Sequence, residues 1–258
     1  MDWDDYFYPG TSTLRNKWGE RDQNLLHTME YQVTKRRQRE LEDGTATVPR
    51  DFGPDHIKGI HGHLFQDVYQ WAGQYRDVGM VKVSAQGGIG FTSPGQIDFW
   101  MLSVQDFVRN TNWQSMNAGE FVEAASLTFA HVNQAHPFRE GNGRTSKIYM
   151  QHVAELSPFR LDFSHIDPTM WNLSSELSRP SPMRPTIDAT YLYPAFAAAT
   201  RPATQAPPAA APQQGIGPRS ASYPRAATAA PQQPPQLSKP AAGYTPKQQP
   251  YRGPGRTR

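Results

Sequence analysis

Residues 136–147 carry the sequence HPFREGNGRTSK. Within this segment His136 can exchange a proton near neutral pH, Glu140 offers a carboxylate, and two glycines flank Asn142. The apolar spacing of residues 145–156 predicts a helix directly after the glycines. Unpaired N–H groups and the positive end of the helix dipole make such a helix start an anion site. The segment is therefore predicted to hold a polyphosphate.

Two fixed positive charges, Arg144 and Lys147, close the segment. No G-x-x-x-x-G-K-[ST] sequence occurs in the chain, so this is not a Walker A loop. The simpler alternative is a loop between helices that has glycines for its turn and charges for solubility. A histidine, an acid and two bases at this spacing favour a binding site over that alternative.

The segment resembles the signature of the Fic family, H-x-F-x-[D/E]-G-N-G-R-x-x-R, and follows its commonest form from His136 through Thr145. One functional position departs, because Lys147 stands where the family has Arg. A second run, HLFQDVYQWAG at residues 63–73, is similar to the segment that precedes the flap in that family. The resemblance spans roughly residues 8–196 and implies a mainly α fold, a Fic-type helical bundle with a short β-hairpin flap.

Apolar periodicity along the chain agrees with a helical domain. Helices are predicted at residues 21–41, 55–71, 94–107, 121–133, 145–156 and 168–177. Partial alternation interrupted by glycines predicts a β-hairpin at residues 75–91. We expect a Fic domain over residues 1–197, with its core at about 55–178, followed by a disordered C-terminal tail over residues 198–258.

The tail differs from the rest of the chain in composition. Only 37% of the 258 residues are hydrophobic, the mean hydropathy is −0.70, and Pro, Ala and Gln dominate beyond residue 200. Such a segment cannot bury enough apolar surface to offset its ordering entropy. It holds eight Lys and Arg and no acid, which leaves a net charge of −5 before residue 201. Its basic residues are dispersed and have no aromatic platform beside them, so binding to nucleic acid is not expected. The tail is expected to be a solvated segment, with a linker or a secretion or localisation segment as the alternatives.

Composition also bounds the class of protein. With no cysteine, a disulfide framework and a Cys metal site are excluded. No apolar run reaches ~18 residues, so no membrane span is predicted, and the acidic start MDWDD is unlike a secretory leader. A cytoplasmic bacterial protein is expected, with translocation into a host or neighbouring cell as an effector as the alternative.

Several histidines lie outside the signature. His61 and His63 fall on two sides of a predicted helix and have no partner at metal-ligand spacing, so polar or interfacial packing is expected. His131 and His136 are five residues apart, which does not fit the H-E-x-x-H zinc arrangement. His131 is therefore expected to pack in the core.

The resemblance implies a protein adenylyltransferase that moves AMP from ATP onto a Ser, Thr or Tyr hydroxyl of a target protein, as a toxin or effector. His136 would act as general base on the hydroxyl, which requires hydrogen-bond reach and a pKa near 7. Glu140 would hold a Mg²⁺ ion that bridges the phosphates.

The remaining residues of the loop would bind the nucleotide. Backbone N–H groups of Gly141, Asn142 and Gly143, with the side chain of Asn142, would stabilise charge on the α-phosphate. Arg144 would grip the β- and γ-phosphates through its planar fork. Lys147 keeps the charge of the family's second Arg but loses the bidentate geometry, so weaker positioning of ATP is expected.

The predicted flap, residues 78–91, carries Gln86, Gly87 and Gly88 where the family often has Lys-Gly-Gly. In the family this hairpin is thought to hold an extended segment of the target by strand addition, which needs few specific side chains. These three residues are therefore included with the expected nucleotide and target site. The alternative is a plain surface hairpin.

The family's inhibitory helix carries [ST]-x-x-x-E-[GN], and here Glu140 is the only Glu followed by Gly or Asn. The resemblance then points to the class restrained by a separate small antitoxin protein, or to an effector without such a brake. Two other functions stay open: a Fic-fold transferase that uses another donor (UMP, phosphate or phosphocholine), and a non-catalytic scaffold that acts through its Pro-rich tail.

Overall fold

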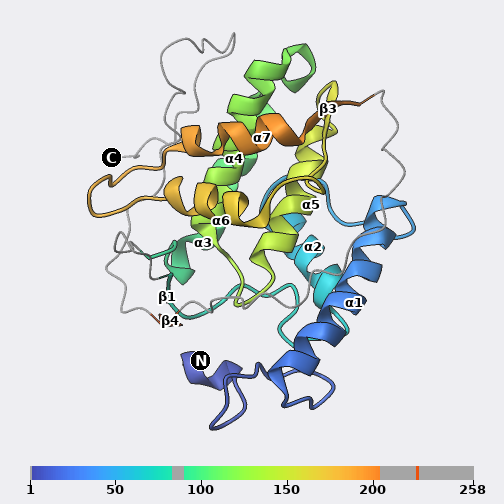
Figure 1. The fold of residues 1–258 in the computed structure, drawn as a ribbon, viewed down its shortest axis with the longest axis vertical. Helices are drawn as coiled ribbons and strands as arrows, with labels where there is room; N and C mark the ends of the chain where they lie inside the picture. Colours follow the sequence, from blue (N-terminus) through green and yellow to red (C-terminus); the bar gives the residue numbers. More distant parts are fainter. Residues whose placement is uncertain (1, 83–89, 204–224, 227–258) are drawn as a thin grey trace, which may run out of the picture.

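The computed structural model describes residues 2–82, 90–203 and 225–226 (Figure 1). The described residues are mainly helical, which confirms the predicted fold class. The α-helices are α1 (Gln23–Glu42), α2 (Pro54–Phe65), α3 (Ile97–Asn110), α4 (Ala118–Ala135), α5 (Asn142–Ala154), α6 (Pro168–Leu177) and α7 (Tyr193–Ala199). Short 3-10 helices are η1 (Trp3–Tyr6), η2 (Pro94–Gln96), η3 (Trp113–Ser115) and η4 (Ala189–Leu192).

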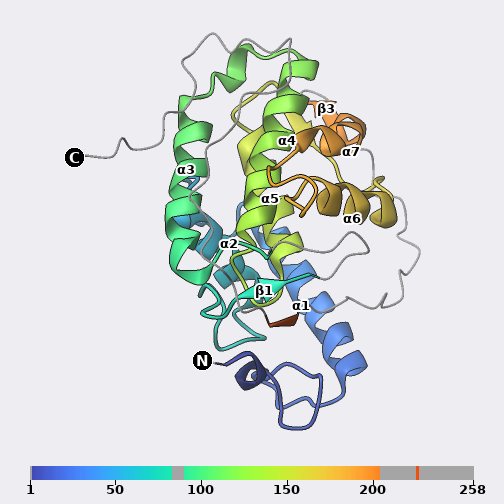
Figure 2. The same ribbon diagram turned by 90° about the vertical axis from the view of Figure 1, so that its left-hand side faces the viewer.

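Helix α4 is the centre of the bundle. Asn117 caps its start in a capping box with Glu120, which satisfies two otherwise unpaired backbone N–H groups. Thirteen of its residues are buried, because it packs against α3, α5 and α7. Figure 2 shows α3 on one side of α4, with α6 and α7 on the other. The helix predicted at 121–133 and the core position expected for His131 are thus confirmed.

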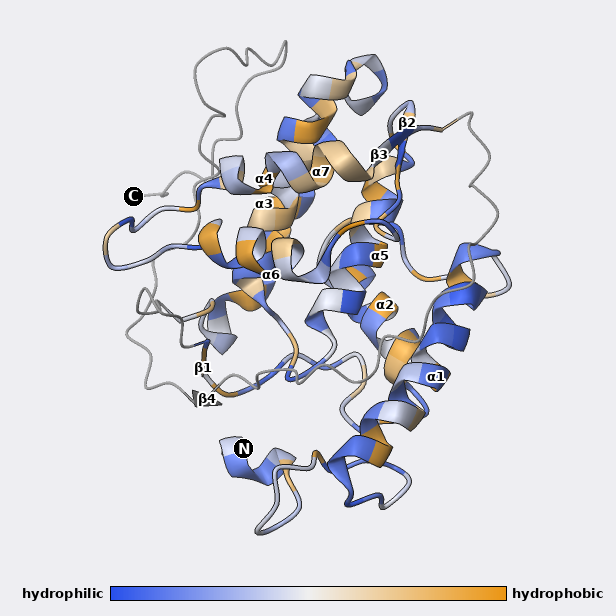
Figure 3. Cartoon of the chain, in the orientation of Figure 1, coloured by the Kyte–Doolittle hydropathy of each residue, from blue (hydrophilic) through white to orange (hydrophobic). Residues whose placement is uncertain are grey.

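Helices α1, α2 and α5 form a second layer, in which α2 contacts both α1 and α5. Helix α1 is hydrophilic along most of its length (Figure 3). Its buried residues are Leu26, Glu30, Thr34 and Leu41. Two of these four are polar, and one is a carboxylate, so this contact surface is not a simple apolar stripe.

Helix α2 ends at Phe65, six residues before the end of the predicted helix 55–71. The backbone N–H groups of Val68 and Tyr69 both turn back to the Phe65 carbonyl, and Gly73 has a φ of 80°. The apolar residues of 66–71 are part of the core although they follow a turn. The predicted helix is therefore six residues too long, because it included buried apolar residues that lie beyond the turn.

The strands form two short antiparallel pairs. Strand β2 (Phe159–Leu161) pairs with β3 (Thr200–Pro202), with Arg160 opposite Arg201. This pairing places residues 200–202 against the bundle, beyond the expected domain end at 197. Strand β1 (Met80–Val81) pairs with β4 (Arg225–Ala226).

The described ends of the predicted flap lie together, because the Phe91 N–H donates to the Met80 carbonyl at 2.9 Å. Residues 83–89, which include Gln86, Gly87 and Gly88, lie outside the described residues. The same holds for most of the tail, so its disorder stays a prediction. Within residues 2–82, 90–203 and 225–226, none of the helices could span a bilayer.

Candidate active site

The signature loop joins α4 to α5. His136 ends α4 in the left-handed region at φ 40°, and Gly141 precedes α5 at φ 83°. A side chain at Gly141 would meet the ring of Phe65 at 2.3 Å, so only glycine fits there. Helix α5 starts at Asn142, three residues before the predicted start at 145. The glycine turn therefore does lie at a helix N-terminus, as the sequence predicted.

The side chain of Asn142 stabilises the loop through two hydrogen bonds to its backbone. Its amide Oδ1 accepts from the Phe138 N–H at 2.9 Å, and its Nδ2 donates to the Phe138 carbonyl at 2.7 Å. Both amide atoms thus bond to the loop backbone. The expected contact of this side chain with a phosphate stays a prediction.

His136 lies where α4 meets the signature loop. Its imidazole stacks on the ring of Phe91 with centroids 3.8 Å apart. Burial, helped by the positive charges of Arg179 and Arg76, holds the pKa of His136 well below its ordinary value. The imidazole is therefore neutral at pH 7 and can accept a proton, as a general base must, but its pKa lies below the value near 7 that the sequence led us to expect, because the side chain is buried.

Arg76 fixes the backbone on both sides of His136. Its side chain is 2% exposed and donates to the carbonyls of His136 and Val78, each at 2.8 Å, and to that of Thr92. Its own N–H donates to the Pro137 carbonyl at 2.9 Å. One guanidinium thus links the start of the flap to the signature loop. Sequence analysis did not single out this residue.

His61 supports the loop from α2. Gly73 donates its N–H to His61 Nδ1 at 2.8 Å, so Nε2 carries the proton and donates to the Glu140 carbonyl at 3.1 Å. The ring also stacks on Phe138 at 3.8 Å. Burial lowers the pKa of His61 to about 3. The interfacial packing expected for His61 is confirmed, and its second role as a hydrogen-bond bridge was missed.

Glu140 presents its carboxylate beside the loop. Oε1 accepts the N–H of Gly141 at 2.9 Å and lies 3.5 Å from Nη2 of Arg144. Within the described ranges no cluster of three or more His, Cys, Asp or Glu could hold a metal ion. A lone carboxylate suits Mg²⁺ that takes its other ligands from phosphates and water. Glu140 therefore fits the expected metal role.

Arg144 points toward α1. Its guanidinium pairs with Glu30, donates from Nη1 to Thr34 Oγ1 at 3.0 Å and lies 4.7 Å from the Phe65 ring centroid. Burial opposes its charge, but Glu30 and Glu140 outweigh burial and raise the pKa of Arg144. The structure shows these protein contacts, and the expected grip on β- and γ-phosphates stays a prediction.

Lys147 lies over two aromatic rings. Its Nζ is 5.0 Å from the ring centroid of Trp171 and 5.6 Å from that of Phe163, within the range of cation–π attraction. Burial lowers its pKa. The ammonium is thus held by the α6 side of the site, a position that the sequence did not predict.

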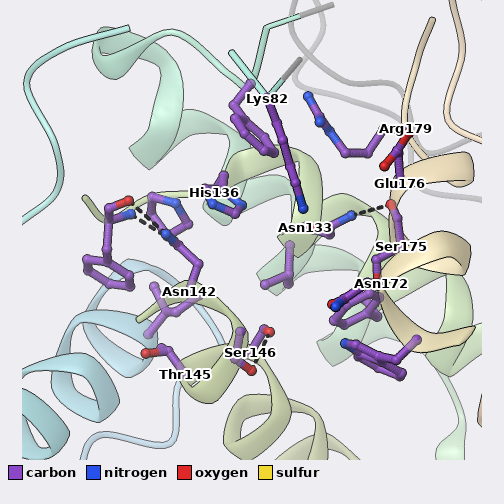
Figure 4. Close-up of a pocket in the computed structure, with 18 residues that line it drawn as sticks. Lys82, Asn133, His136, Asn142, Thr145, Ser146, Asn172, Ser175, Glu176 and Arg179 are labelled. Atoms are coloured by element: carbon purple, nitrogen blue, oxygen red, sulfur yellow. Dashed lines mark hydrogen bonds between the residues drawn. The ribbon is translucent and has the colours of Figure 1, made fainter. Parts of the chain in front are cut away.

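A pocket opens between the signature loop, α4, the flap and α6 (Figure 4). The polar and charged residues that line it are Lys82, Asn133, His136, Asn142, Thr145, Ser146, Asn172, Ser175, Glu176 and Arg179. The Asn133 amide donates to the Ser175 carbonyl at 2.8 Å and ties α4 to α6. The pocket therefore brings His136 and the first turn of α5 together with a polar face of α6.

Sequence analysis missed this face of α6. Asn172, Ser175 and Glu176 stand at i, i+3 and i+4, a polar stripe that was visible in the predicted helix 168–177. Arg179 follows the helix, is 6% exposed, and places Cζ 3.6 Å from the Phe91 ring centroid. Burial lowers its pKa to about 10, so this guanidinium is charged at neutral pH.

The fold defines a class of proteins. A solved structure of the BepC protein of Bartonella tribocorum with bound AMPPNP superposes with a TM-score of 0.65 at 23% identity, covering 77% of this chain and 97% of that one. The type IV secretion system effector protein BepA gives a TM-score of 0.64 at 25% identity, covering 77% and 69%. The helical bundle of this chain therefore has the fold of these effector proteins.

Sequence comparison gives the family. The Fic/DOC family model matches residues 51–154. The probable protein adenylyltransferase y4lH of Sinorhizobium fredii is 37% identical over 168 residues, which cover 62% of this chain and 80% of that protein. Protein adenylyltransferase VbhT of Bartonella schoenbuchensis is 33% identical over 165 residues, 64% of this chain and 33% of that protein. The chain belongs to the Fic/DOC family, as the resemblance predicted.

Proposed function

We propose that this chain is a protein adenylyltransferase, which moves AMP from ATP onto a hydroxyl side chain of a target protein. The observation that carries the proposal is the neutral His136 imidazole in a pocket that also contains Asn142 and Gly143 at the start of α5. A base and an anion-binding helix end face one cavity, which is the arrangement that nucleotidyl transfer requires. The curated relatives y4lH and VbhT bear the name protein adenylyltransferase.

The transfer itself is one displacement at phosphorus. The target hydroxyl gives its proton to His136, its oxygen bonds to the α-phosphorus of ATP, and the bond from that phosphorus to the β-phosphate oxygen breaks to release pyrophosphate. Negative charge grows on the α-phosphate oxygens, where the N–H groups of Asn142 and Gly143 would stabilise it, since the Gly141 N–H already donates to Glu140. Lys147, which keeps a charge near the pocket, would attract the far phosphates.

Glu140 would hold Mg²⁺. A bound Mg²⁺ ion would neutralise phosphate charge and orient the leaving group. Glu140 suits this role because its carboxylate is 24% exposed and lies beside the helix start. The protein therefore needs to supply only one anionic ligand, and the nucleotide supplies others.

The target would dock on the flap, residues 78–91. Strand β1 pairs with β4, which supports strand addition at this edge. Phe91 anchors the flap against His136, so a strand added there would lie close to the base. A separate small antitoxin, and action as a toxin or translocated effector, remain parts of the proposal that target identification would test.

The test is label transfer in a lysate. The full chain is incubated with α-³²P-ATP, Mg²⁺ and bacterial lysate, with His136→Ala in parallel. We expect label on a protein band with the wild type and none with the variant. Label from γ-³²P-ATP instead would identify a phosphate transferase, and label from α-³²P-UTP a UMP transferase. No label from any nucleotide would contradict the proposal and leave the scaffold function of the Pro-rich tail.

A further inference from the structure

Helix α1 brings an acidic residue to the edge of the site. Glu30 is 4% exposed and Thr34 is 2% exposed, and they lie one turn apart on the face of α1 that meets the bundle. A buried carboxylate is costly unless it is paired and hydrogen-bonded. Neither residue belongs to the part of the chain, 51–154, that matches the family model.

Both residues bind the guanidinium of Arg144. Nη2 of Arg144 pairs with Oε1 of Glu30, and Nη1 donates to Thr34 Oγ1 at 3.0 Å. The second carboxylate oxygen of Glu30 accepts from the hydroxyl of Tyr69, which is buried in the core. The Thr34 hydroxyl in turn donates to the Glu30 carbonyl at 2.8 Å. Glu30 is thus held rigidly and orients Arg144.

The same guanidinium nitrogen faces a second carboxylate. Nη2 of Arg144 lies 3.5 Å from Oε1 of Glu140, farther than from Glu30. Attraction between charges falls with distance, and Glu30 is both nearer and more buried than Glu140. The ion pair of Arg144 with Glu30 is therefore stronger than its ion pair with Glu140. Arg144 therefore does not close on the Glu140 carboxylate, which stays 24% exposed.

We infer that Glu30 is a positioning residue of the active site, which holds Arg144 against α1 so that Glu140 stays available to a divalent cation. The inference deepens the proposed function and rests on the metal role of Glu140 in it. Without Glu30, Arg144 would close on Glu140 and compete with the cation for it. Helix α1 is then a part of the catalytic site and not only of the fold.

Glu30→Gln tests the role of the charge. Gln has nearly the same volume, and its amide can still bond to Arg144 through oxygen and to the Tyr69 hydroxyl through nitrogen. The variant therefore removes the charge and leaves the hydrogen-bonding capacity. Glu40→Gln is the matched control, since Glu40 is on the same helix and pairs with Arg37 at 2.9 Å at the surface, 27% exposed.

Cation binding is measured with Mn²⁺ by electron paramagnetic resonance, on the full chain with a non-hydrolysable ATP analogue. We expect Glu30→Gln to weaken Mn²⁺ binding about 10-fold, the scale seen when a residue just outside the metal ligands is lost, and Glu40→Gln to leave it unchanged. AMP transfer should need more Mg²⁺ in Glu30→Gln and recover at high Mg²⁺. A purely structural role would lower the rate at all Mg²⁺ concentrations.

Unchanged Mn²⁺ affinity in a folded Glu30→Gln protein would overturn the inference. Tighter binding or faster AMP transfer would also overturn it, because Glu30 would then restrain the site. If Glu30→Gln does not fold, Thr34→Val removes one Arg144 contact with little change of shape, and a smaller shift in the same direction is expected; no shift would count against the inference. A wild type that transfers no AMP, but whose Mn²⁺ affinity depends on Glu30, would refute the proposed function alone.

Discussion

The imidazole of His136 and the ring of Phe91 are stacked with centroids 3.8 Å apart and planes 18° apart. Phe91 is 2% exposed and its N–H is bonded to the Met80 carbonyl. Phe91, at the end of the predicted flap, therefore covers the imidazole of His136 directly. This contact contributes to the burial that lowers the pKa of His136.

Phe91→Leu should move the pH dependence of AMP transfer. Wild-type kcat/KM should persist as pH falls below 6.5, because His136 has a lowered pKa and stays neutral there. The variant admits water to the imidazole, so its pKa rises and the rate falls at a higher pH. The measurement is kcat/KM between pH 5 and 8, with Phe107→Leu on α3 as control. An unchanged inflection would show that Phe91 does not shield the base.

Buried neutral histidines should make the fold acid-sensitive. Burial lowers the pKa of His131 to about 3, below the unfolded value, so the unfolded state binds more protons below about pH 6.5. Stability is therefore full above that pH and falls as pH drops toward 3.

His131→Leu should reduce this dependence by up to about 1.4 kcal/mol per pH unit. The measurement is the free energy of unfolding in urea at pH 7, 6 and 5. His165→Leu, at an exposed position, should leave the slope as in the wild type. An equal slope for His131→Leu and the wild type would contradict the prediction.

Gly141→Ala should disable the loop. The new Cβ would lie 2.3 Å from the Phe65 ring at a φ of 83°, so both overpacking and the left-handed backbone oppose it. We expect a loss of at least about 2 kcal/mol of stability and no nucleotide binding. Gly95→Ala, which meets nothing within 4 Å, is the control. Thermal unfolding and calorimetric ATP titration give the readouts, and a stable Gly141→Ala protein would refute the clash.

Lys147→Met should separate the contribution of the Lys147 charge to ATP binding from that of its contacts with the aromatic rings. Met retains the apolar contact with Trp171 and Phe163 but removes the positive charge. If the charge attracts phosphates, the KM for ATP should rise about 10-fold with a smaller change in kcat. Lys147→Arg should lower that KM, because the planar fork suits phosphate oxygens. Equal KM values for all three proteins would assign Lys147 to packing alone.

Arg76→Lys should loosen the link between flap and loop. Lysine cannot reach the carbonyls of His136, Val78 and Thr92 at once, so buried acceptors lose their donors. We expect a loss of about 2–4 kcal/mol, measured by urea unfolding. Arg109→Lys, whose side chain is exposed and donates to Asp51 at 3.1 Å, should change stability by less than about 0.5 kcal/mol. Comparable losses in both variants would argue against a special role for Arg76.

The sequence alone predicted the signature loop and its place before a helix. His136, Glu140 and the glycines around Asn142 are local in sequence, and a turn before a helix depends mainly on neighbouring residues. The helical pattern of residues 121–133 was equally local, since apolar spacing and an Asn cap define it. Family membership followed from the same residues.

Only the tertiary structure decided which side chains meet that loop. The side chains in question are Glu30 on α1, His61 on α2, Arg76 before the flap and Arg179 after α6. Each lies 43 to 114 residues along the chain from the signature residue with which it interacts, namely Arg144, Glu140 or His136. Each of these residues is polar or charged and yet buried. From composition and periodicity alone, such a residue is predicted to lie on the surface or to serve only in packing. Their partners are set by how α1, α2 and α6 pack on α4 and α5, because a long-range hydrogen bond depends on that packing and leaves no trace in local spacing.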